Sequence, residues 1–491
     1  MFSRGLWGYL PANILQGLIG FATLMAFTRI LSPEAYGVYA LTFGVSSLAQ
    51  TAFFTWLEAS MARFYPAHAR NDAEAPALYG TLYRLFVAVA VVFALLCVAG
   101  LLLWRTHTPE GQALKVGVAI GLACVAPRSL VKLAQEQRKS EGRVTPAAVI
   151  DMVQTAGAFG FGLACAWAGI GGASPVLGAG LIALVIMPFV VREDWGRAVR
   201  GYFDKAEASH MAHYGFPVSA SLILTLALYT ADRFLIAHYL NEAEAGAYHA
   251  GYSIASRILD VLFIWFGAAG TPAMVHALEN GGVTALKDVA RHQLTTMCFV
   301  LFPAVGGLIM VTPSLGGLLI GEALRTQALS VTPLITLGAL LSGLNTYYFL
   351  QAFTLARRTK LLVAAMAIPS VSNIALNVLL IPRMGLMGAA LAALIAFALG
   401  LAASWLLGLR TLRLPVPWLA LGKIALSVAV MLAVLAALPS WGGLPELLLK
   451  SASGALIYAA LAWLLDLNGV RAPAARIVAR LRAKFAARVT P

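Results

Sequence analysis

Apolar runs long enough to cross a bilayer dominate this sequence. A membrane-spanning helix needs roughly 20 predominantly apolar residues, and fourteen such stretches follow one another with short connections. They cover 6–31, 37–65, 77–104, 112–135, 144–168, 174–191, 213–240, 246–275, 293–312, 328–355, 361–381, 385–408, 418–438 and 446–466. Only 11% of the 491 residues are charged, against about 25% in soluble domains. The sequence therefore predicts an all-α polytopic membrane protein with about fourteen transmembrane helices. It excludes a soluble enzyme and a nucleic-acid-binding module.

The placement of lysine and arginine predicts the orientation of these helices. With the N-terminus in the cytoplasm, 25 of the 35 basic residues fall in cytoplasmic segments and 6 on the opposite side. Because short cytoplasmic loops carry such an excess, both ends are predicted to be cytoplasmic. In the basic tail an apolar residue recurs every four positions, at Ile477, Leu481, Phe485 and Val489. This pattern predicts a helix on the inner leaflet, with a basic tail that only enforces orientation as the alternative.

An internal repeat divides the chain into two similar halves. Leu31, Gly37 and Tyr39 recur as Leu240, Gly246 and Tyr248 at an offset of 209 residues. Gly169 and Gly172 recur as Gly385 and Gly388 at an offset of 216. Each half holds six spans, so the two halves share one orientation, as in transporters with parallel repeats. We predict an N-lobe at 1–192, a cytoplasmic linker at 193–212, a C-lobe at 213–408, two further helices at 418–466 and the tail at 467–491.

Polar residues inside the spans predict where a transport cavity lies. An ionisable group at mid-membrane costs at least about 2.5–3.5 kcal/mol, so it is expected to face protein or water. Arginine binds phosphate oxygens through a bidentate fork and keeps its charge, whereas amides suit sugar hydroxyls. An arginine-lined cavity therefore predicts an anionic substrate such as a diphosphate. The candidate cavity residues are Arg29, Arg84, Arg128, Arg233, Arg257, Asn13, Gln135 and Asn377.

Three acidic residues in the same spans fit two roles. Glu58, Asp232 and Asp260 are candidates to carry a coupling H⁺ or Na⁺. Alternatively they neutralise arginines: Asp260 pairs with Arg257 three positions earlier, Asp232 with Arg257 or Arg233, and Glu58 with Arg84 or Arg128. The sequence leaves both roles open.

The remaining functional expectations concern a gate and the absence of cofactors. Pro217, early in the seventh span, removes a backbone hydrogen bond and is predicted to let that helix bend as the cavity opens. The four cysteines lie in apolar runs away from histidine, so neither a metal site nor a disulfide framework is predicted. No cofactor is expected beyond the coupling ion.

Three stretches of the sequence resemble a known family. They are R-I-L-S-P-E-A-Y-G-V-Y from Arg29 to Tyr39, the Asp232-Arg233 pair followed by Gly246-A-Tyr248, and Asn377-V-L-L-I-Pro382-R-M-Gly385-L-M-Gly388. They are similar to the Wzx-type polysaccharide repeat-unit flippases of the multidrug/oligosaccharidyl-lipid/polysaccharide exporter superfamily.

That resemblance implies two lobes around a cationic cavity and no enzymatic activity. The implied substrate is an undecaprenyl-diphosphate-linked glycan, moved from the cytoplasmic to the periplasmic leaflet of a bacterial inner membrane. Membrane lipids, a polysaccharide polymerase and glycosyltransferases are the further implied partners. The acidic residues Glu58, Asp232 and Asp260 depart from a purely cationic cavity.

Other functions remain as alternatives. A lipid II flippase and an ion-coupled drug or cation exporter belong to the same superfamily, but a cation exporter is expected to have a site dominated by acids. A membrane glycosyltransferase or polymerase requires a carboxylate pair or a catalytic outer loop. The sequence has no D-x-D, H-E-x-x-H or G-x-S-x-G motif.

Overall fold

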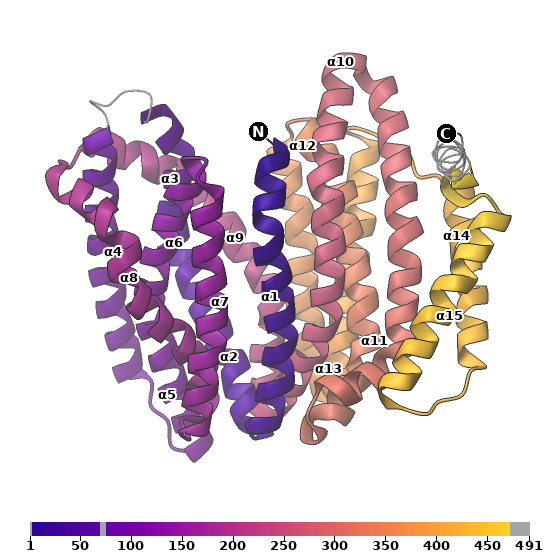
Figure 1. The fold of residues 1–491 in the computed structure, drawn as a ribbon, viewed down its shortest axis with the longest axis horizontal. Coiled ribbons are helices and arrows are strands. Elements are labelled where there is room, and N and C mark those ends of the chain that lie inside the picture. The colour runs from indigo at the N-terminus through magenta and orange to yellow at the C-terminus, as the bar shows by residue number, and fades with distance from the viewer. Residues whose placement is uncertain (1, 69–74, 472–491) are drawn as a thin grey trace, which may run out of the picture. The chain divides into compact units, whose positions relative to one another are not determined.

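The structure is a computed structural model that describes residues 2–68 and 75–471 (Figure 1). The predicted all-α class is confirmed, because the described residues form helices joined by short connections and contain no strand. The predicted tail helix lies outside the described residues. The α-helices are α1 (Phe2–Ile30), α2 (Pro33–Phe53), α3 (Thr55–His68), α4 (Ala75–Leu103), α5 (Pro109–Ala123), α6 (Val125–Ser140), α7 (Val144–Trp167), α8 (Ser174–Arg200), α9 (Lys205–Tyr239), α10 (Glu242–Leu319), α11 (Glu322–Leu344), α12 (Gln351–Leu355), α13 (Thr359–Leu409), α14 (Trp418–Ala436) and α15 (Gly443–Leu464).

Among the described residues, eleven helical segments are long and apolar enough to cross a membrane. Two of these are double: α10 folds back at Gly282 and α13 at Gly385, where the backbone φ is +66° and +58°. The fold-back of α10 is visible beside its label in Figure 1. The chain is thus a multi-pass membrane protein, and the number of fourteen crossings stays a prediction.

Short polar residues begin several helices where the sequence changes from a connection to an apolar run. The Ser32 hydroxyl accepts a hydrogen bond from the backbone N–H of Ala35 at 3.2 Å, and Thr108 caps α5 in the same way. A proline follows each of these caps, where its missing N–H costs nothing. The Asp204 carboxylate caps α9 through the Ala206 N–H at 2.7 Å. The predicted linker 193–212 therefore consists mainly of two helix ends joined at 201–204.

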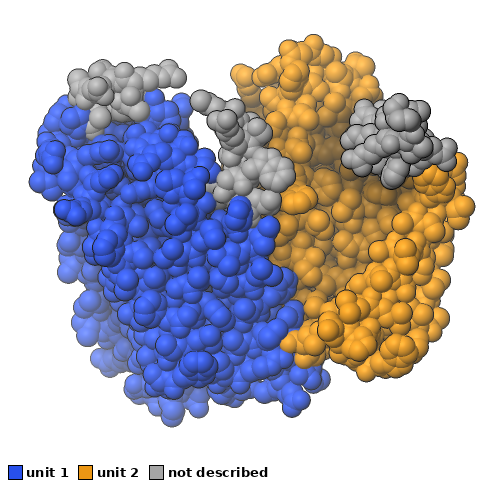
Figure 2. Space-filling view, in the orientation of Figure 1, with its two compact units in different colours: residues 1–250, 319–328, 373–389 blue, residues 251–318, 329–372, 390–491 orange. Residues whose placement is uncertain are grey.

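Contacts within the chain define two compact units, coloured blue and orange in Figure 2. Unit 1 comprises 1–250, 319–328 and 373–389, and unit 2 comprises 251–318, 329–372 and 390–491. Unit 1 has an aromatic-rich core around Phe54, Trp56 and Tyr83, and unit 2 has a core around Phe263, Met297 and Tyr348. The division into lobes at 192 and 213 follows the sequence repeat and stays a prediction.

The second pair of repeat glycines has the same unusual backbone in both halves. Gly169 has φ +80° and Gly385, its counterpart 216 residues later, has φ +58°. Side chains other than glycine rarely adopt this left-handed conformation. The repeated glycine pattern therefore marks equivalent turns, between α7 and α8 in one case and inside α13 in the other.

Candidate transport and coupling site

Two membrane helices of unit 1 are interrupted near their middle. The predicted spans 37–65 and 112–135 each form two helices, which meet at Phe54 and at Cys124. Behind Cys124, Pro127 has no N–H to bond the Ala123 carbonyl, which favours the interruption. The first turn of α3 carries Glu58, and the first turn of α6 carries Arg128. Interrupted membrane helices commonly form ligand sites in transporters.

Glu58 is buried and paired, but with a different partner from those expected. Lys132 on α6 lies 2.9 Å from its carboxylate, and the Gln50 amide on α2 donates to it at 3.4 Å. The predicted pairing of Glu58 with Arg84 or Arg128 is therefore wrong. Lys132 lies one helical turn beyond Arg128, and this position along α6 brings its ammonium to Glu58. This ion pair joins α3 to α6, the two half-helices that follow the interruptions.

Arg128 is half-buried and keeps its guanidinium free. Among the residues that the structure describes, it makes no side-chain hydrogen bond and has no carboxylate within 4 Å. A charge inside a membrane helix is costly without compensation. Arg128 is therefore a side chain whose full fork is available to a ligand.

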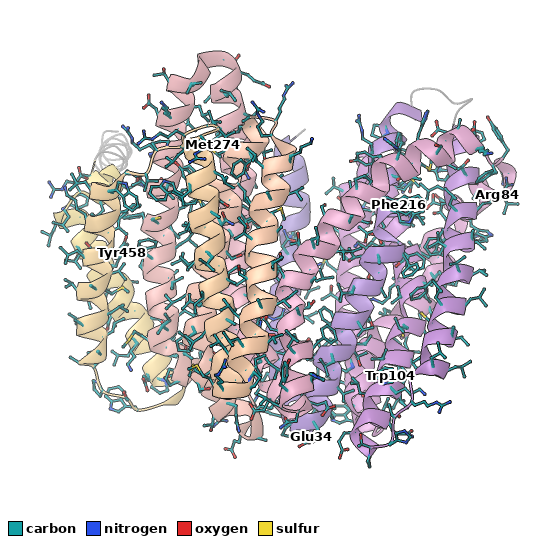
Figure 3. All side chains as sticks on the ribbon, turned by 180° about the vertical axis from the view of Figure 1, so that it is seen from behind. Glu34, Arg84, Trp104, Phe216, Met274 and Tyr458 are labelled. Carbon is teal, nitrogen blue, oxygen red and sulfur yellow. The ribbon has the colours of Figure 1, made fainter. Side chains whose placement is uncertain are left out.

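Arg84 and Gln135 are both engaged with the protein itself. The Arg84 guanidinium is exposed at the edge of unit 1 (Figure 3) and donates to the Gly201 carbonyl at 2.9 Å. The Gln135 amide is buried and donates to Asp151 and Gln154 on α7, at 3.0 and 3.2 Å. The structure does not bring these two together, and each of them links neighbouring segments of unit 1.

Asp232 is the centre of a buried polar network in unit 1. Its carboxylate accepts hydrogen bonds from the Tyr248 hydroxyl at 2.9 Å and from the Asn377 amide at 2.7 Å. The same amide contacts the Asn373 side-chain oxygen at 3.1 Å. The neighbouring Arg233 acts on this carboxylate electrostatically, although no salt bridge within 4 Å joins Asp232 to Arg233 or Arg257 in the described part of the chain. The Arg233 guanidinium instead donates to the Tyr229 carbonyl at 2.8 Å.

Arg257 and Asp260 belong to unit 2 and do not neutralise each other as expected. No carboxylate of the described residues lies within 4 Å of the half-buried Arg257 guanidinium, whose Nε is buried without a hydrogen-bond partner. Asp260 is exposed. The spacing of three residues permits a pair, but among the described residues no salt bridge within 4 Å joins them. Arg257 therefore resembles Arg128 in having an unused fork.

The three other predicted residues lie at the surface of unit 1. Arg29 donates to the Met25 carbonyl at 2.9 Å and reaches the Leu319 carbonyl at 3.5 Å. Asn13 is exposed on α1. Pro217 is exposed inside α9, directly after Phe216, which stacks on Trp56 of α3 with ring centroids 4.8 Å apart. The segment of α9 before Pro217 is thereby fixed to α3, as a hinge at Pro217 requires.

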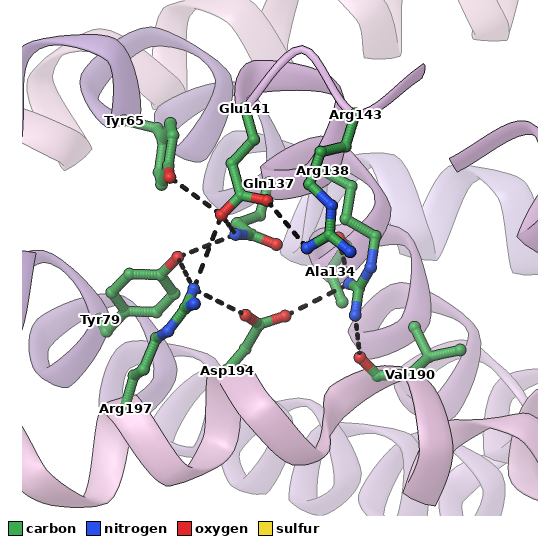
Figure 4. Close-up of polar contacts among 10 residues, drawn as sticks. All are labelled: Tyr65, Tyr79, Ala134, Gln137, Arg138, Glu141, Arg143, Val190, Asp194 and Arg197. Carbon is green, nitrogen blue, oxygen red and sulfur yellow. Dashed lines mark hydrogen bonds and ion pairs between the residues drawn. The ribbon is translucent and has the colours of Figure 1, made fainter. Parts of the chain in front are cut away.

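Sequence analysis missed a larger polar network at one end of unit 1 (Figure 4). Buried Asp194 on α8 lies 3.4 Å from Arg138 and 3.7 Å from Arg197. The Tyr79 hydroxyl on α4 accepts from Arg197 at 2.9 Å, and Glu141 accepts from Tyr65 on α3 at 2.9 Å. The network therefore ties α3, α4, α6 and α8 together. In the sequence these basic residues serve only to predict the orientation of the helices. The spacing of three residues between Asp194 and Arg197 was nevertheless a signal for an ion pair.

The fold is that of a polytopic membrane protein with charged side chains inside its apolar helices. Residues 26–328 match the model of a family described as "Polysaccharide biosynthesis protein". Because the match covers more than half of the chain, the chain belongs to this family. No curated protein matches the chain.

Solved structures confirm the superfamily fold. The lipid II flippase MurJ in an inward closed conformation matches with a TM-score of 0.74 and 15% identity, covering 93% of this chain and 98% of that one. An inward-facing multidrug resistance MATE transporter matches with a TM-score of 0.63 and 15% identity, over 84% and 96%. A MOP superfamily transporter from Pyrococcus furiosus matches at 0.52 and 14%, over 83% and 92%. The family model thus confirms the expected polysaccharide family, and the solved structures show that the chain shares the fold of these membrane proteins.

Proposed function

We propose that the protein is a flippase for undecaprenyl-diphosphate-linked oligosaccharide repeat units. It moves them from the cytoplasmic to the periplasmic leaflet of a bacterial inner membrane by alternating access, and it makes or breaks no covalent bond. Both termini lie in the cytoplasm. Membership of a polysaccharide biosynthesis family and a fold shared with a lipid II flippase support this proposal.

The observation that carries the proposal is that two intramembrane arginines have unused guanidinium forks. Arg128 in unit 1 and Arg257 in unit 2 form no ion pair with a described residue. A diphosphate offers oxygens in the geometry that arginine binds through two parallel hydrogen bonds. Binding such an anion would offset the cost of holding these charges inside the membrane. A cationic drug would be repelled by the same side chains.

Asp232 is the proposed coupling site. Its carboxylate lies among the oxygens and amides of Asn373 and Asn377. Carboxylate and amide oxygens are ligands for hard cations, and a lone buried carboxylate also accepts a proton. We therefore assign a coupling Na⁺ or H⁺ to Asp232. Asp260, which is exposed and unpaired among the described residues, is the weaker candidate.

The test replaces the fork of Arg257 while keeping its charge. The Arg257→Lys variant should insert normally but bind the lipid-linked oligosaccharide at least tenfold more weakly, since one lost charge-assisted hydrogen bond is worth about 1.5–3 kcal/mol. Arg383→Lys is the matched control, because Arg383 is exposed and donates to the Leu379 carbonyl of its own helix at 2.9 Å. If Arg257→Lys and the control bind the lipid-linked oligosaccharide with equal affinity, Arg257 is not one of the residues that bind the substrate.

Competition separates the proposed substrate from the alternatives. Lipid-linked oligosaccharide should displace bound substrate better than lipid II or a cationic dye. An incubation of the purified protein with radiolabelled sugar donor should leave the lipid unextended. Transfer of sugar in the absence of a partner enzyme would identify a glycosyltransferase instead.

A further inference from the structure

The first pair of repeat loops packs directly against each other inside unit 1. The start of α2 contacts the start of α10, two segments separated by 209 residues. A Cβ added to Gly37 would lie 1.8 Å from the Glu242 carbonyl oxygen. A Cβ added to Gly246 would lie 2.8 Å from the Gly37 nitrogen and 3.1 Å from the Pro33 carbonyl oxygen. Neither helix can approach the other in this way with a larger residue at these positions.

This contact is reciprocal. Gly37 packs on Glu242, and Gly246 packs on Pro33. Because Gly246 is the repeat equivalent of Gly37, and Glu242 that of Pro33 at the same offset of 209, the same patch of each half meets its own counterpart. Such a self-complementary contact is what a two-fold axis produces in a dimer. Within unit 1 the two equivalent loops therefore meet through the same pair of glycine positions.

Neighbouring contacts reinforce this junction. The Thr28 hydroxyl at the end of α1 accepts from the Gly321 N–H at 3.0 Å, and a Cβ on Gly321 would lie 2.1 Å from the Thr28 carbonyl oxygen. The His249 ring on α10 lies among aromatic rings of α2, with Tyr39 at 5.7 Å and Tyr36 at 6.0 Å. The first and second halves thus meet through backbone contacts and packed rings at one end of unit 1.

We propose that this reciprocal glycine contact is the seal that closes one end of the transport path, and that it separates when that end opens. The orientation predicted from lysine and arginine makes this the periplasmic end. A backbone-to-backbone contact suits a reversible seal, because it excludes water without long side chains that must be reordered in each cycle. The inference rests on the proposed function in that it assumes alternating access.

The same geometry links the seal to the coupling site. Tyr248 follows Gly246 by two residues and holds the Asp232 carboxylate through its hydroxyl at 2.9 Å. A cation or proton on Asp232 weakens the acceptor that Tyr248 binds. Tyr248 is therefore the positioning residue through which occupancy of Asp232 acts on the seal.

The test adds one methyl group to each glycine in a cysteine-free background that carries Ala245→Cys. Ala245 is fully buried, so an impermeant maleimide reaches it only when the seal is open. Gly37→Ala should raise labelling several-fold and slow transport, and Gly246→Ala should do so less, since its clash is milder. Gly100→Ala is the control, because no atom lies within 4 Å of its added Cβ. Unchanged labelling in a folded Gly37→Ala protein would overturn the proposal.

A second measurement covers the case in which Gly37→Ala does not accumulate. A cleavable bifunctional maleimide joining Glu34→Cys to Asn241→Cys should stop transport, and cleavage should restore it. Full transport by the cross-linked protein would overturn the proposal. If Gly37→Ala raises labelling but the protein moves no oligosaccharide, the proposal about the seal stands and the proposed function is refuted.

Discussion

Replacement of Asp232 by asparagine should separate stability from transport. The carboxylate is 4% exposed and, among described residues, has two side-chain donors but no cation within 4 Å. Burial of a charge without a salt bridge costs free energy even when hydrogen bonds partly compensate it. Asparagine has the same shape without the charge, and its oxygen can still accept from Tyr248. The Asp232→Asn protein should therefore be at least as stable as the wild type, yet it should have lost ion-dependent transport.

Replacement of Tyr248 by phenylalanine should have the opposite effect on stability. This change removes a hydrogen bond to a charged acceptor, worth about 1.5–3 kcal/mol, and leaves the buried carboxylate with one donor fewer. The Tyr248→Phe protein should consequently lose about 1.5–3 kcal/mol of folding free energy. The two variants should therefore change the free energy of unfolding in different ways, although they alter the two partners of one hydrogen bond.

Two assays check this pair of variants. Unfolding in detergent–SDS mixtures gives the free-energy differences, and vesicles with imposed H⁺ or Na⁺ gradients give the ion dependence of transport. Thr230→Val is the control, because the buried Thr230 hydroxyl donates to the Leu226 carbonyl oxygen of its own helix at 2.7 Å. One hydrogen bond to a charged group is worth about 1.5–3 kcal/mol, so a fall of about 2 kcal/mol or more in the free energy of unfolding of Asp232→Asn would refute this account of the network. Ion-coupled transport by Asp232→Asn would refute it as well.

Three further predictions follow from other parts of the chain. Pro217→Ala should slow transport more than it lowers abundance, because it restores a hydrogen bond at the expected hinge; an unchanged rate would leave Pro217 as a packing residue. Asp194→Ala should cost about 3–5 kcal/mol, since it leaves the buried Arg138 without a carboxylate; Arg138→Ala should cost less, because Asp194 keeps Arg197 at 3.7 Å, and the double variant should unfold less readily than Asp194→Ala alone. Cysteine labelling should place 201–204 in the cytoplasm and 104–108 outside; the reverse result would contradict the orientation.

The sequence predicted the helices because a bilayer permits few alternatives. Backbone groups without partners are too costly in lipid, so each long apolar run must be helical. The repeat was predictable for a related reason, since only glycine serves where Gly385 has positive φ or where Gly37 meets another backbone. Even the fold-back at Gly385 coincides with the start of a predicted span, 385–408.

The partners of the charged side chains could not be predicted. Helical periodicity gives the face on which a residue lies, but it does not give the residue opposite it on another helix. Glu58 therefore pairs with Lys132 in place of an arginine, and Asp232 is held by Tyr248 and Asn377. Asn377 is 145 residues from Asp232 along the chain, so no local pattern joins them.

Interrupted helices were also beyond the sequence pattern. Hydropathy over 37–65 and 112–135 is continuous, because Phe54 and Cys124 are as apolar as their neighbours. Pro127, three residues after Cys124, was a weak indication of the second interruption. No proline lies at the corresponding distance after Phe54, where the first interruption occurs. The position of Arg128 in the first turn of a half-helix therefore emerged only from the structure.

The central claim is that this protein moves an anionic, lipid-linked oligosaccharide across the membrane. The most direct measurement uses purified protein in vesicles loaded with fluorescent undecaprenyl-diphosphate-linked oligosaccharide, with an impermeant glycosidase reporting which leaflet holds the glycan. The account predicts protein-dependent translocation that Arg257→Lys diminishes and Arg383→Lys does not. Translocation of lipid II or export of a cationic dye, without movement of the oligosaccharide, would contradict it.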